Sequence, residues 1–318
     1  MAVGAVLLLW RLAAGADPVA WNVGPPVFSP GPAGSFDETA VKDPSIVFAE
    51  GFWRLFYTAR GNNLYTLGYA AAPTLPELAK ARRYQLTQLR AEKQVYAAAP
   101  QVFYFRQQKK WYLIYQTTDR HYQPVYSTTT TIDQPESWSR PKPLIDHTDN
   151  AKWIDFWVIC DAKKAYLFFT REQKEVVVMT TAIGDFPAGF ADPKAVLSPL
   201  IEAAHVYRVQ GSAERYEMLY EVADGQLRKF RLATAGALSG SWRQETDDYA
   251  SGRELTYAPG AQHWTDEVSH GELLRAGNDE RLEVAARPVQ FLMQGMPAAQ
   301  HKGDYPQLPW RLGLLTLK

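Results

Sequence analysis

Short runs of apolar and aromatic residues, each closed by a polar turn, recur along the chain. One unit reads K-D-P-S-I-V-F and then F-W-R-L-F-Y-T. Similar pairs are W-I-D-F-W-V-I-C with A-Y-L-F-F-T, and I-E-A-A-H-V-Y-R-V with Y-E-M-L-Y-E-V. Alternating or short apolar runs bounded by Gly, Asn, Asp or basic pairs are typical of β-strands. Because sustained helical periodicity is nearly absent, the pattern predicts an all-β fold.

These strand pairs recur as a repeat. Units start near residues 43, 100, 155, 202 and 270, a spacing of roughly 45 to 70 residues, and four short strands with their turns need about 40 to 50. Trp138 in S-W-S-R and Trp242 in S-G-S-W-R precede expected outer strands, where an indole packs between sheets. With no low-complexity linker or composition break, residues 17–318 are predicted to form one domain, a five-bladed β-propeller.

Two segments depart from the repeat. Residues 75–90 (L-P-E-L-A-K-A-R-R-Y-Q-L-T-Q-L-R) are the best helical candidate, although they could equally be an insertion that carries a strand. Residues 1–16 resemble a secretory signal that ends near Gly15-Ala16, but they have no basic n-region and Arg11 interrupts the apolar run. The run is too short to span a membrane. We therefore expect export, with residues 1–16 as a leader.

The composition of the chain limits the classes of molecule that it is expected to bind. The 34 basic and 34 acidic residues balance to a formal net charge of zero, which argues against a nucleic acid or an anionic membrane. Aromatic residues make up 13% of the chain; most suit a β-sheet core, and rings beside carboxylates also suit sugars. The single cysteine, Cys160, excludes a disulfide within the chain and is expected to be a buried, inert thiol. Metalloprotease, zinc, nucleotide and lipase motifs are absent from the sequence.

Three acidic residues, Asp43, Asp155 and Glu202, stand at the entrance of three similar strands. The innermost strand of each propeller blade lines a central channel, so equivalent positions face one pocket. Converging carboxylates raise one another's pKa, an arrangement usually kept for chemistry. Glycoside hydrolysis needs two carboxyl groups with different roles, and a third can tune the acid. Acids at strand entrances also cap turns or bind Ca²⁺, so a structural role stays open.

The residues next to each acid in the sequence suggest its backbone conformation and its ionisation. Pro44 should restrict Asp43 to extended backbone, and Lys42 could bind a sugar hydroxyl or keep Asp43 ionised. Asp155 lies in an apolar segment, where an unpaired charge is costly. Glu202 also has apolar neighbours, which disfavour the ionised form as a general acid requires.

The chain resembles glycoside hydrolase family 62, the α-L-arabinofuranosidases that act on arabinoxylan. The resemblance runs from about Trp21 to the C-terminus and rests on V-K-D-P-S-I-V-F, A-A-P-Q-V-F-Y-F, W-Y-L-I-Y-Q, W-I-D-F-W-V-I-C-D, S-H-G-E-L-L-R and G-D-Y-P-Q-L-P-W-R-L-G-L-L. It implies a five-bladed β-propeller, in agreement with the repeats. It also implies a secreted, inverting hydrolase that removes single arabinofuranosyl side groups.

The resemblance further implies a role for each acid. Asp43 is expected to be the general base and Glu202 the general acid, with carboxyls roughly 6.5–9.5 Å apart, while Asp155 tunes and orients the acid. It implies one calcium ion near His270 and no organic cofactor; from the residues alone, His270 in S-H-G-E could be a metal or sugar ligand or a hydrogen-bonded core histidine. A monomer that binds arabinoxylan or its oligosaccharides is expected, with sugar contacts from Lys42, Ala99, Gln116 and Tyr305.

The chain departs from the family pattern in two places. Relatives commonly read G-D-Y-N-x-L-P-W, where this chain has Pro306, and many have Trp where it has Thr117-Thr118. Both differences fall where the xylan backbone is expected to lie. Two alternatives stay open: a β-xylosidase or arabinanase on a related propeller, and a non-catalytic carbohydrate-binding propeller.

Overall fold

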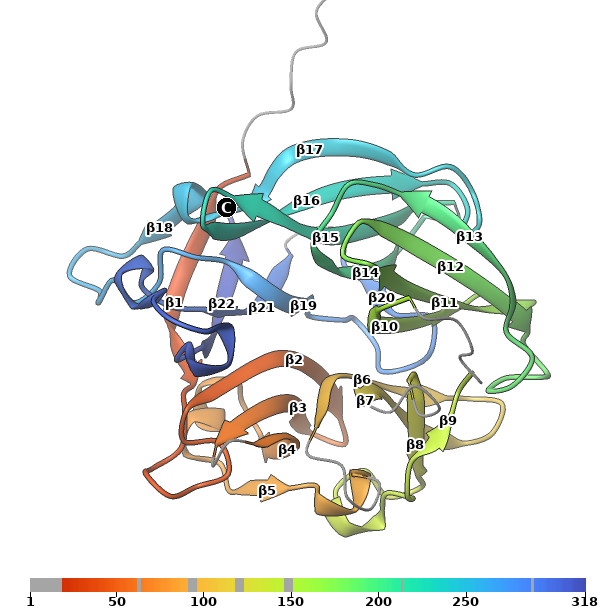
Figure 1. Ribbon diagram of the computed structural model, residues 1–318, viewed down its shortest axis with the longest axis horizontal. Helices are drawn as coiled ribbons and strands as arrows, with labels where there is room; N and C mark the ends of the chain where they lie inside the picture. The colour runs from red at the N-terminus through yellow and green to blue at the C-terminus, as the bar shows by residue number, and fades with distance from the viewer. Residues whose placement is uncertain are drawn as a thin grey trace, which may run out of the picture.

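Five β-sheets surround a central channel in the computed structural model of the protein, which describes residues 19–61, 64–90, 96–117, 123–145, 151–212, 214–286 and 289–318 (Figure 1). The all-β, five-bladed propeller predicted from the repeats is confirmed. The innermost strands begin at residues 40, 97, 153, 202 and 269, close to the predicted starts. Among the described residues, no helix has the length and apolar character needed to cross a membrane.

The first three blades each contain four strands in chain order, the innermost first. The first blade consists of β2 (Ala40–Ala49), β3 (Phe52–Gly61), β4 (Leu64–Ala72) and β5 (Arg83–Gln85). The second consists of β6 (Ala97–Phe105), β7 (Lys110–Thr117), β8 (Val125–Thr129) and β9 (Lys142–Pro143). The third consists of β10 (Trp153–Cys160), β11 (Lys164–Arg171), β12 (Glu175–Ala182) and β13 (Ala191–Leu197).

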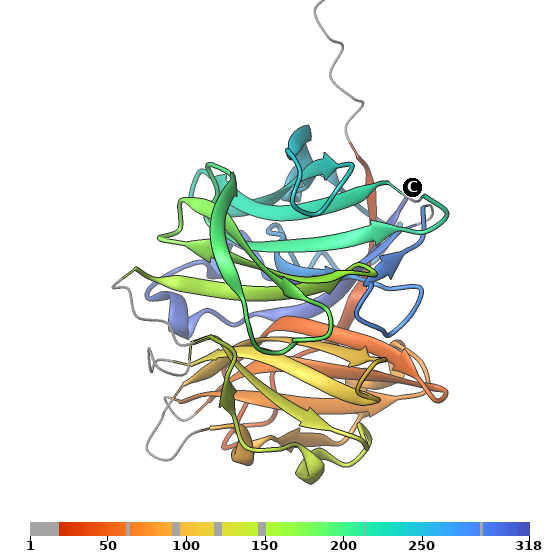
Figure 2. The ribbon, with the colours of Figure 1, turned by 90° about the vertical axis from the view of Figure 1, so that its right-hand side faces the viewer.

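The last two blades depart from this order. The fourth consists of β14 (Glu202–Val209), β15 (Tyr216–Asp224), β16 (Leu227–Ala235) and β17 (Arg243–Ala250), with β20 (Glu283–Val284) parallel to β14. The fifth consists of β19 (Ser269–Leu273), β21 (Gln290–Gly295), β22 (Arg311–Leu317), β1 (Trp21–Phe28) and β18 (Leu255–Tyr257). Viewed from the side, the third and fourth blades, in green to cyan, lie above the first two, in orange to yellow (Figure 2).

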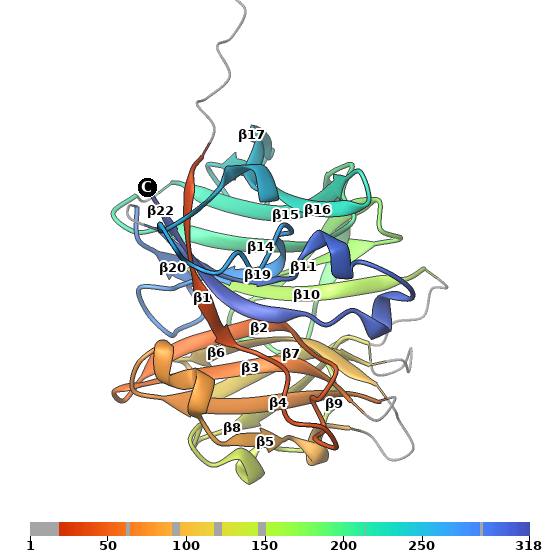
Figure 3. The same ribbon diagram turned by 90° about the vertical axis from the view of Figure 1, so that its left-hand side faces the viewer.

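The N-terminal strand closes the propeller. β1 pairs antiparallel with β22, with Trp21 opposite Leu317 (Figure 3). This pairing joins the first described strand to the last, so the fifth blade is built from both ends of the chain. Trp21 is fully buried in the main core cluster, and its indole N–H donates to the Tyr249 carbonyl at 2.6 Å. The repeat pattern did not predict this closure.

In the part of the chain that the structure describes, the helical segments of the connections are all short 3₁₀ turns. They are η1 (Pro76–Lys80), η2 (Thr87–Leu89), η4 (Pro135–Ser137), η5 (Gly252–Glu254), η6 (Ala298–Gln300) and η7 (Tyr305–Gln307). Residues 75–90 therefore form two 3₁₀ turns around β5, which agrees with the strand-carrying alternative and not with a single helix. Trp138 and Trp242 are buried just before the outer strands β9 and β17, as predicted. Cys160 is a buried free thiol, and burial raises its pKa.

The far end of the channel is closed by the segment around β20. Three of its backbone carbonyls accept hydrogen bonds from N–H groups at or just beyond the ends of three inner strands. Asn278 accepts from Tyr104, Glu280 from Cys160 and Val284 from Gln210, each at 2.8 Å. These contacts lie at the opposite end of the inner strands from the candidate acids. The channel is therefore a pocket and not a through-going hole.

Every inner strand has a bulge at its entrance. The register with the second strand shifts after Lys42, Ala98, Ile154, Glu202 and Ser269. In four blades the next residue has left-handed backbone: Asp43 (φ 47°), Ala99 (φ 50°), Asp155 (φ 57°) and Ala203 (φ 56°). A bulge bends the strand and re-aims its side chains. The bulges thus direct side chains from separate blades towards one mouth of the channel.

The bulges correct two predictions. Glu202 is not the equivalent of Asp43 and Asp155, because it lies one residue before its bulge, at the position of Lys42. The presence of Pro44 predicted extended backbone for Asp43, but Asp43 has left-handed backbone (φ 47°). Asp tolerates left-handed backbone better than most residues, and the Gln294 Oε1 atom accepts the Asp43 N–H at 2.9 Å, which holds the bulge in place.

Hydrogen bonds between blades hold these bulges. A side chain on the second strand of one blade accepts from the bulge N–H of the next: Thr58 from Ala99 (2.8 Å), Gln116 from Asp155 (2.9 Å), Glu221 from His270 (2.8 Å) and Gln294 from Asp43 (2.9 Å). The third blade differs, because Asp155 Oδ2 accepts from Ala203 at 3.0 Å. Thr170, at the position equivalent to Thr58, has a buried hydroxyl with no hydrogen-bond partner. Asp155 therefore replaces Thr170 as the link to the fourth blade.

Candidate active site

A pocket of about 440 Å³ opens at the bulged end of the channel. All five blades or their connections contribute to its lining: Lys42, Asp43, Tyr65, Tyr96, Gln116, Lys152, Ile154, Asp155, Gln173, Glu202, Arg228, His270, Tyr305 and Pro306. Seven of the eight candidate residues are in this set. The eighth, Ala99, lies at the bulge of β6 but does not line the pocket. The structure thus brings the three acids together, as predicted.

Asp43 lies between two basic side chains. Its Oδ2 atom is 4.0 Å from Lys42 Nζ, and its Oδ1 atom is 3.6 Å from His270 Nδ1. Burial lowers the pKa of Lys42, but Asp43 and then nearby tyrosines outweigh burial, so the pKa of Lys42 is raised. Lys42 is therefore a cation beside the Asp43 carboxyl. Neither distance is that of a hydrogen bond, so the Asp43 oxygens can still accept from water.

Asp155 has a buried carboxyl, and hydrogen bonds hold both its backbone and its side chain. Its N–H donates to Gln116 Oε1 and its Oδ2 accepts from the Ala203 N–H. Burial, then the charges of Glu202 and Asp43, raise the pKa of Asp155 well above its ordinary value. Asp155 therefore keeps a proton at a pH where an exposed aspartate is ionised.

The raised pKa predicts that Asp155→Asn stabilises the protein. A raised native pKa means that the folded state binds more protons than the unfolded chain, so stability falls as pH rises from about 4 towards the native pKa. The amide removes this loss and can still accept from Ala203. We expect the melting temperature at about pH 7 to rise by about 2 °C or more, with the gain shrinking towards pH 4 in a thermal-unfolding series.

Asp192→Asn is a matched control for this series. Asp192 also has left-handed backbone (φ 57°) in the third blade, but its side chain is exposed. The control should leave the melting temperature nearly unchanged across the pH range. An Asp155→Asn gain that is the same at every pH would contradict the titration argument.

Glu202 contacts a residue that the sequence did not reveal, Arg228. One guanidinium nitrogen of Arg228, Nη1, donates to Glu202 Oε1 and to Glu221 Oε1. Burial lowers the pKa of Arg228, but Glu221 and Glu202 outweigh burial and raise it. The guanidinium carbon lies 4.9 Å from the centroid of the Tyr305 ring. Arg228 thus joins the acid to the wall of the pocket.

The sequence analysis missed both Glu221 and Arg228, but only Glu221 could have been found from a sequence signal. Glu221 ends Y-E-M-L-Y-E and occupies the same register position as Gln116 in W-Y-L-I-Y-Q. Aligning the second strands would therefore have found Glu221. Arg228 lies on β16, the third strand of its blade, where no repeat signature marks it.

Aromatic rings and a proline complete the wall. The Gln116 Nε2 atom donates to the Tyr96 hydroxyl at 2.8 Å, and the Tyr65 and Tyr96 rings lie 5.3 Å apart. The Pro306 carbonyl accepts from Arg60 Nε at 3.2 Å. Pro306 lines the pocket as predicted, whereas Thr117 is buried and does not, and Thr118 lies outside the described residues.

The described side chains do not form a calcium site by themselves. Among them, no three His, Cys, Asp or Glu groups gather closely enough to hold a metal ion. The ring of His205 stacks on Trp157, and its Nδ1 atom lies 2.8 Å from the Gly271 carbonyl oxygen. Ca²⁺ prefers about six to eight oxygen ligands, which His270 and these neighbours do not supply. Calcium stays a prediction, and no step below depends on it.

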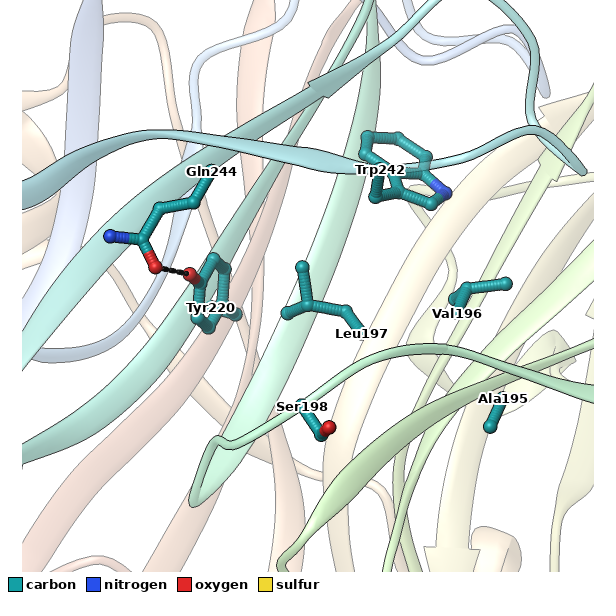
Figure 4. Close-up of a pocket in the computed structure, with 7 residues that line it drawn as sticks. All are labelled: Ala195, Val196, Leu197, Ser198, Tyr220, Trp242 and Gln244. Carbon is teal, nitrogen blue, oxygen red and sulfur yellow. Dashed lines mark hydrogen bonds between the residues drawn. The ribbon is translucent and has the colours of Figure 1, made fainter. Parts of the chain in front are cut away.

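A second pocket, of about 360 Å³, lies between the third and fourth blades (Figure 4). Its lining comes from β13, β15, β17, the residue after β13 and the residue before β17: Ala195, Val196, Leu197, Ser198, Tyr220, Trp242 and Gln244. The Tyr220 hydroxyl donates to Gln244 Oε1 at 3.0 Å. No carboxyl group is among the residues that line it, so it lacks the two carboxyls that glycoside hydrolysis needs.

Comparison with known proteins decides the family. Residues 33–316 match the family model described as glycosyl hydrolase family 62. The chain belongs to glycosyl hydrolase family 62. The resemblance that the motifs indicated is thereby confirmed, and the carboxyl-lined pocket is the candidate active site of a family 62 propeller.

Individual relatives match almost the whole chain. Alpha-L-arabinofuranosidase C of Cellvibrio japonicus is 33% identical over 314 residues, which cover 95% of this chain and 47% of that protein. The chain thus spans about half the length of this curated relative. The catalytic domain of the Coprinopsis cinerea GH62 α-L-arabinofuranosidase is 33% identical with a TM-score of 0.87, covering 95% and 98% of the two chains. A GH62 hydrolase in complex with xylotriose is 30% identical with a TM-score of 0.84, covering 93% and 97%.

Proposed function

We propose that this family 62 propeller removes α-L-arabinofuranosyl side groups from arabinoxylan by inverting hydrolysis. The observation that carries the proposal is the meeting of Asp43, Asp155 and Glu202 in one pocket, each with different neighbours. The pocket is closed at its far end by the segment around β20. A polysaccharide chain cannot thread through it, so a side group or chain end is the unit that enters.

The neighbours of Asp43 suit a general base. Its carboxyl lies 4.0 Å from Lys42 Nζ and 3.6 Å from His270 Nδ1, beyond hydrogen-bond distance of both, so its oxygens are open to water. In the proposed reaction, Asp43 takes a proton from a water molecule as the water oxygen attacks the anomeric carbon of arabinose. Attack from the face opposite the leaving oxygen inverts the anomeric configuration.

Glu202 is the proposed general acid. Its proton passes to the glycosidic oxygen as the bond from that oxygen to the anomeric carbon breaks, which releases the xylan hydroxyl. Asp155 has a raised pKa and holds the Ala203 N–H beside Glu202, so we assign it the positioning of the acid. Solvent then removes the proton from Asp43 and returns one to Glu202, so the net reaction consumes one water.

The names of the relatives support the substrate. Two are arabinofuranosidases, and a third was solved with xylotriose. The tyrosine rings of Tyr65, Tyr96 and Tyr305 line the pocket and can stack on the apolar faces of a sugar. Lys42 and Gln116 can hydrogen-bond its hydroxyls. Export, action as a monomer and a calcium ion near His270 are also proposed, on the sequence pattern and the resemblance alone; residues 1–16 lie outside the described residues.

An NMR time course on arabinoxylan tests the proposal. We expect arabinose as the main product, with the anomer opposite to that of the substrate appearing first. Linear arabinan and xylo-oligosaccharides, run in parallel, test the alternative enzymes. Xylose or arabino-oligosaccharides as main products would contradict the proposal, and binding without sugar release would favour a carbohydrate-binding propeller.

A further inference from the structure

Arg228 is shared between Glu202 and a second carboxyl, Glu221, that the proposed reaction does not use. Glu202 and Glu221 face each other as paired residues on β14 and β15. The Glu221 side chain is completely buried, whereas 14% of the Glu202 side chain is exposed to the pocket. One guanidinium thus serves two carboxyl groups, only one of which can reach a substrate.

An acid that contacts an arginine raises a difficulty for the mechanism. Glu202 must carry a proton for the leaving oxygen, whereas a nearby guanidinium favours the ionised carboxylate. A single guanidinium carries one positive charge and neutralises one carboxylate. The second carboxyl then lies beside an ion pair that is already neutral, in a site where ionisation costs desolvation. Arg228 therefore balances the charge of one of the two carboxyls and not of both.

Glu221 receives hydrogen-bond donors on both of its carboxyl oxygens. Besides Arg228 on Oε1, Glu221 accepts on Oε2 from the Ser269 hydroxyl at 2.8 Å and from the His270 N–H at 2.8 Å. A carboxylate that receives three donors is stabilised as an anion. Burial raises the pKa of Glu221, Arg228 opposes this, and Glu202 adds to it, so the pair as a whole binds a proton more readily than separate carboxyls. The three donors hold the Glu221 carboxyl against Arg228, on the side of the pair that no substrate reaches.

We propose that Glu221 is a positioning residue that takes up the charge of Arg228 and so leaves Glu202 able to protonate the leaving group. This inference rests on the proposed function, in which Glu202 is the general acid. The remaining charged or titratable groups that line the pocket are Lys42, Asp43, Tyr65, Tyr96, Lys152, Asp155, His270 and Tyr305. Tyr305 also lies beside Arg228, with its ring centroid 4.9 Å from the guanidinium carbon, whereas Glu221 accepts a hydrogen bond from Arg228 Nη1.

Glu221 also connects the acid to the base. The Ser269 hydroxyl that donates to Glu221 accepts from Gln294 Nε2 at 3.1 Å, and Gln294 Oε1 accepts from the Asp43 N–H at 2.9 Å. A continuous series of buried hydrogen bonds therefore links Glu202, through Arg228 and Glu221, to the backbone of Asp43. The spacing of acid and base depends on these side chains.

Glu221→Gln tests the inference through two substrates. Without the Glu221 charge, Arg228 pairs with Glu202 alone and stabilises its ionised form. We expect arabinose release from arabinoxylan to fall by about 10-fold or more. Release from 4-nitrophenyl α-L-arabinofuranoside, whose leaving group needs little protonation, should fall by less than about 3-fold. The ratio of the two rates is the readout, and Glu221→Asp, which keeps the charge, should move it back towards the wild-type ratio.

Glu217→Gln is the matched control. Glu217 is a buried carboxyl towards the other end of β15, paired with Arg215 at 2.8 Å. This variant should keep both rates. An unchanged ratio in folded Glu221→Gln would overturn the inference. If that variant does not fold, Ser269→Ala, which removes one donor to Glu221, must shift the ratio in the same direction, and no shift would overturn the inference equally.

Failure of the proposed function would look different. Wild-type protein that releases arabinose from neither substrate would overturn the function and this inference together. Active wild type with an unchanged ratio in the variants would overturn only the role of Glu221.

Discussion

Asp43→Asn is expected to reduce arabinose release by about 10²- to 10⁴-fold on every substrate, because the amide cannot take the proton of the attacking water as the proposed carboxylate base does. Asn accepts left-handed backbone as Asp does, so the bulge at φ 47° and the hydrogen bond from its N–H to Gln294 should persist. Rates on arabinoxylan and on 4-nitrophenyl α-L-arabinofuranoside, with thermal unfolding as the folding control, provide the measurement. Near-wild-type release on either substrate would refute the assignment of Asp43 as the base.

Glu202→Gln is expected to show a different pattern. Release from arabinoxylan should fall by about 10²- to 10⁴-fold, because the xylan hydroxyl is a poor leaving group without a proton. Release from the 4-nitrophenyl substrate should fall far less, since nitrophenolate leaves without protonation. The amide oxygen can still accept from Arg228, so the pocket should keep its shape. The same two rate measurements check this prediction.

The contrast between the two variants separates acid from base. Equal losses on both substrates in Glu202→Gln would contradict its role as the acid. A loss in Asp43→Asn confined to arabinoxylan would suggest that the two roles are exchanged. The wild-type protein and the exposed-site variant Asp192→Asn serve as references for both series.

Local patterns predicted the parts of the fold that depend on neighbouring residues. The inner strands, their second strands and the tryptophans before outer strands follow from alternation, turns and aromatic placement. Closure did not follow, because β1 and β22 lie at opposite ends of the chain and pair only in the folded molecule. The backbone of Asp43 was predicted wrongly for a similar reason. The local effect of Pro44 is overridden by a hydrogen bond from Asp43 to Gln294, 251 residues away.

The candidate site shows the same division. Asp43 and Asp155 were found from the pattern at strand entrances, and Gln116 and Tyr305 from the family resemblance. Glu221 and Arg228 were not, because their importance depends on which side chains they reach. Arg228 Nη1 donates to both Glu202 and Glu221, and these hydrogen bonds join three strands of the fourth blade.

By itself, the sequence determined an all-β chain of five repeats, the three acids and the family motifs, because these depend on short-range periodicity and on residue types. Tertiary structure alone decided the bulge that separates Glu202 from the register of Asp43 and Asp155, the closure by β1, and the arginine shared by Glu202 and Glu221. The physical reason is that register, closure and charge pairing depend on groups distant in sequence, whose distances are set only when the five blades pack around the channel.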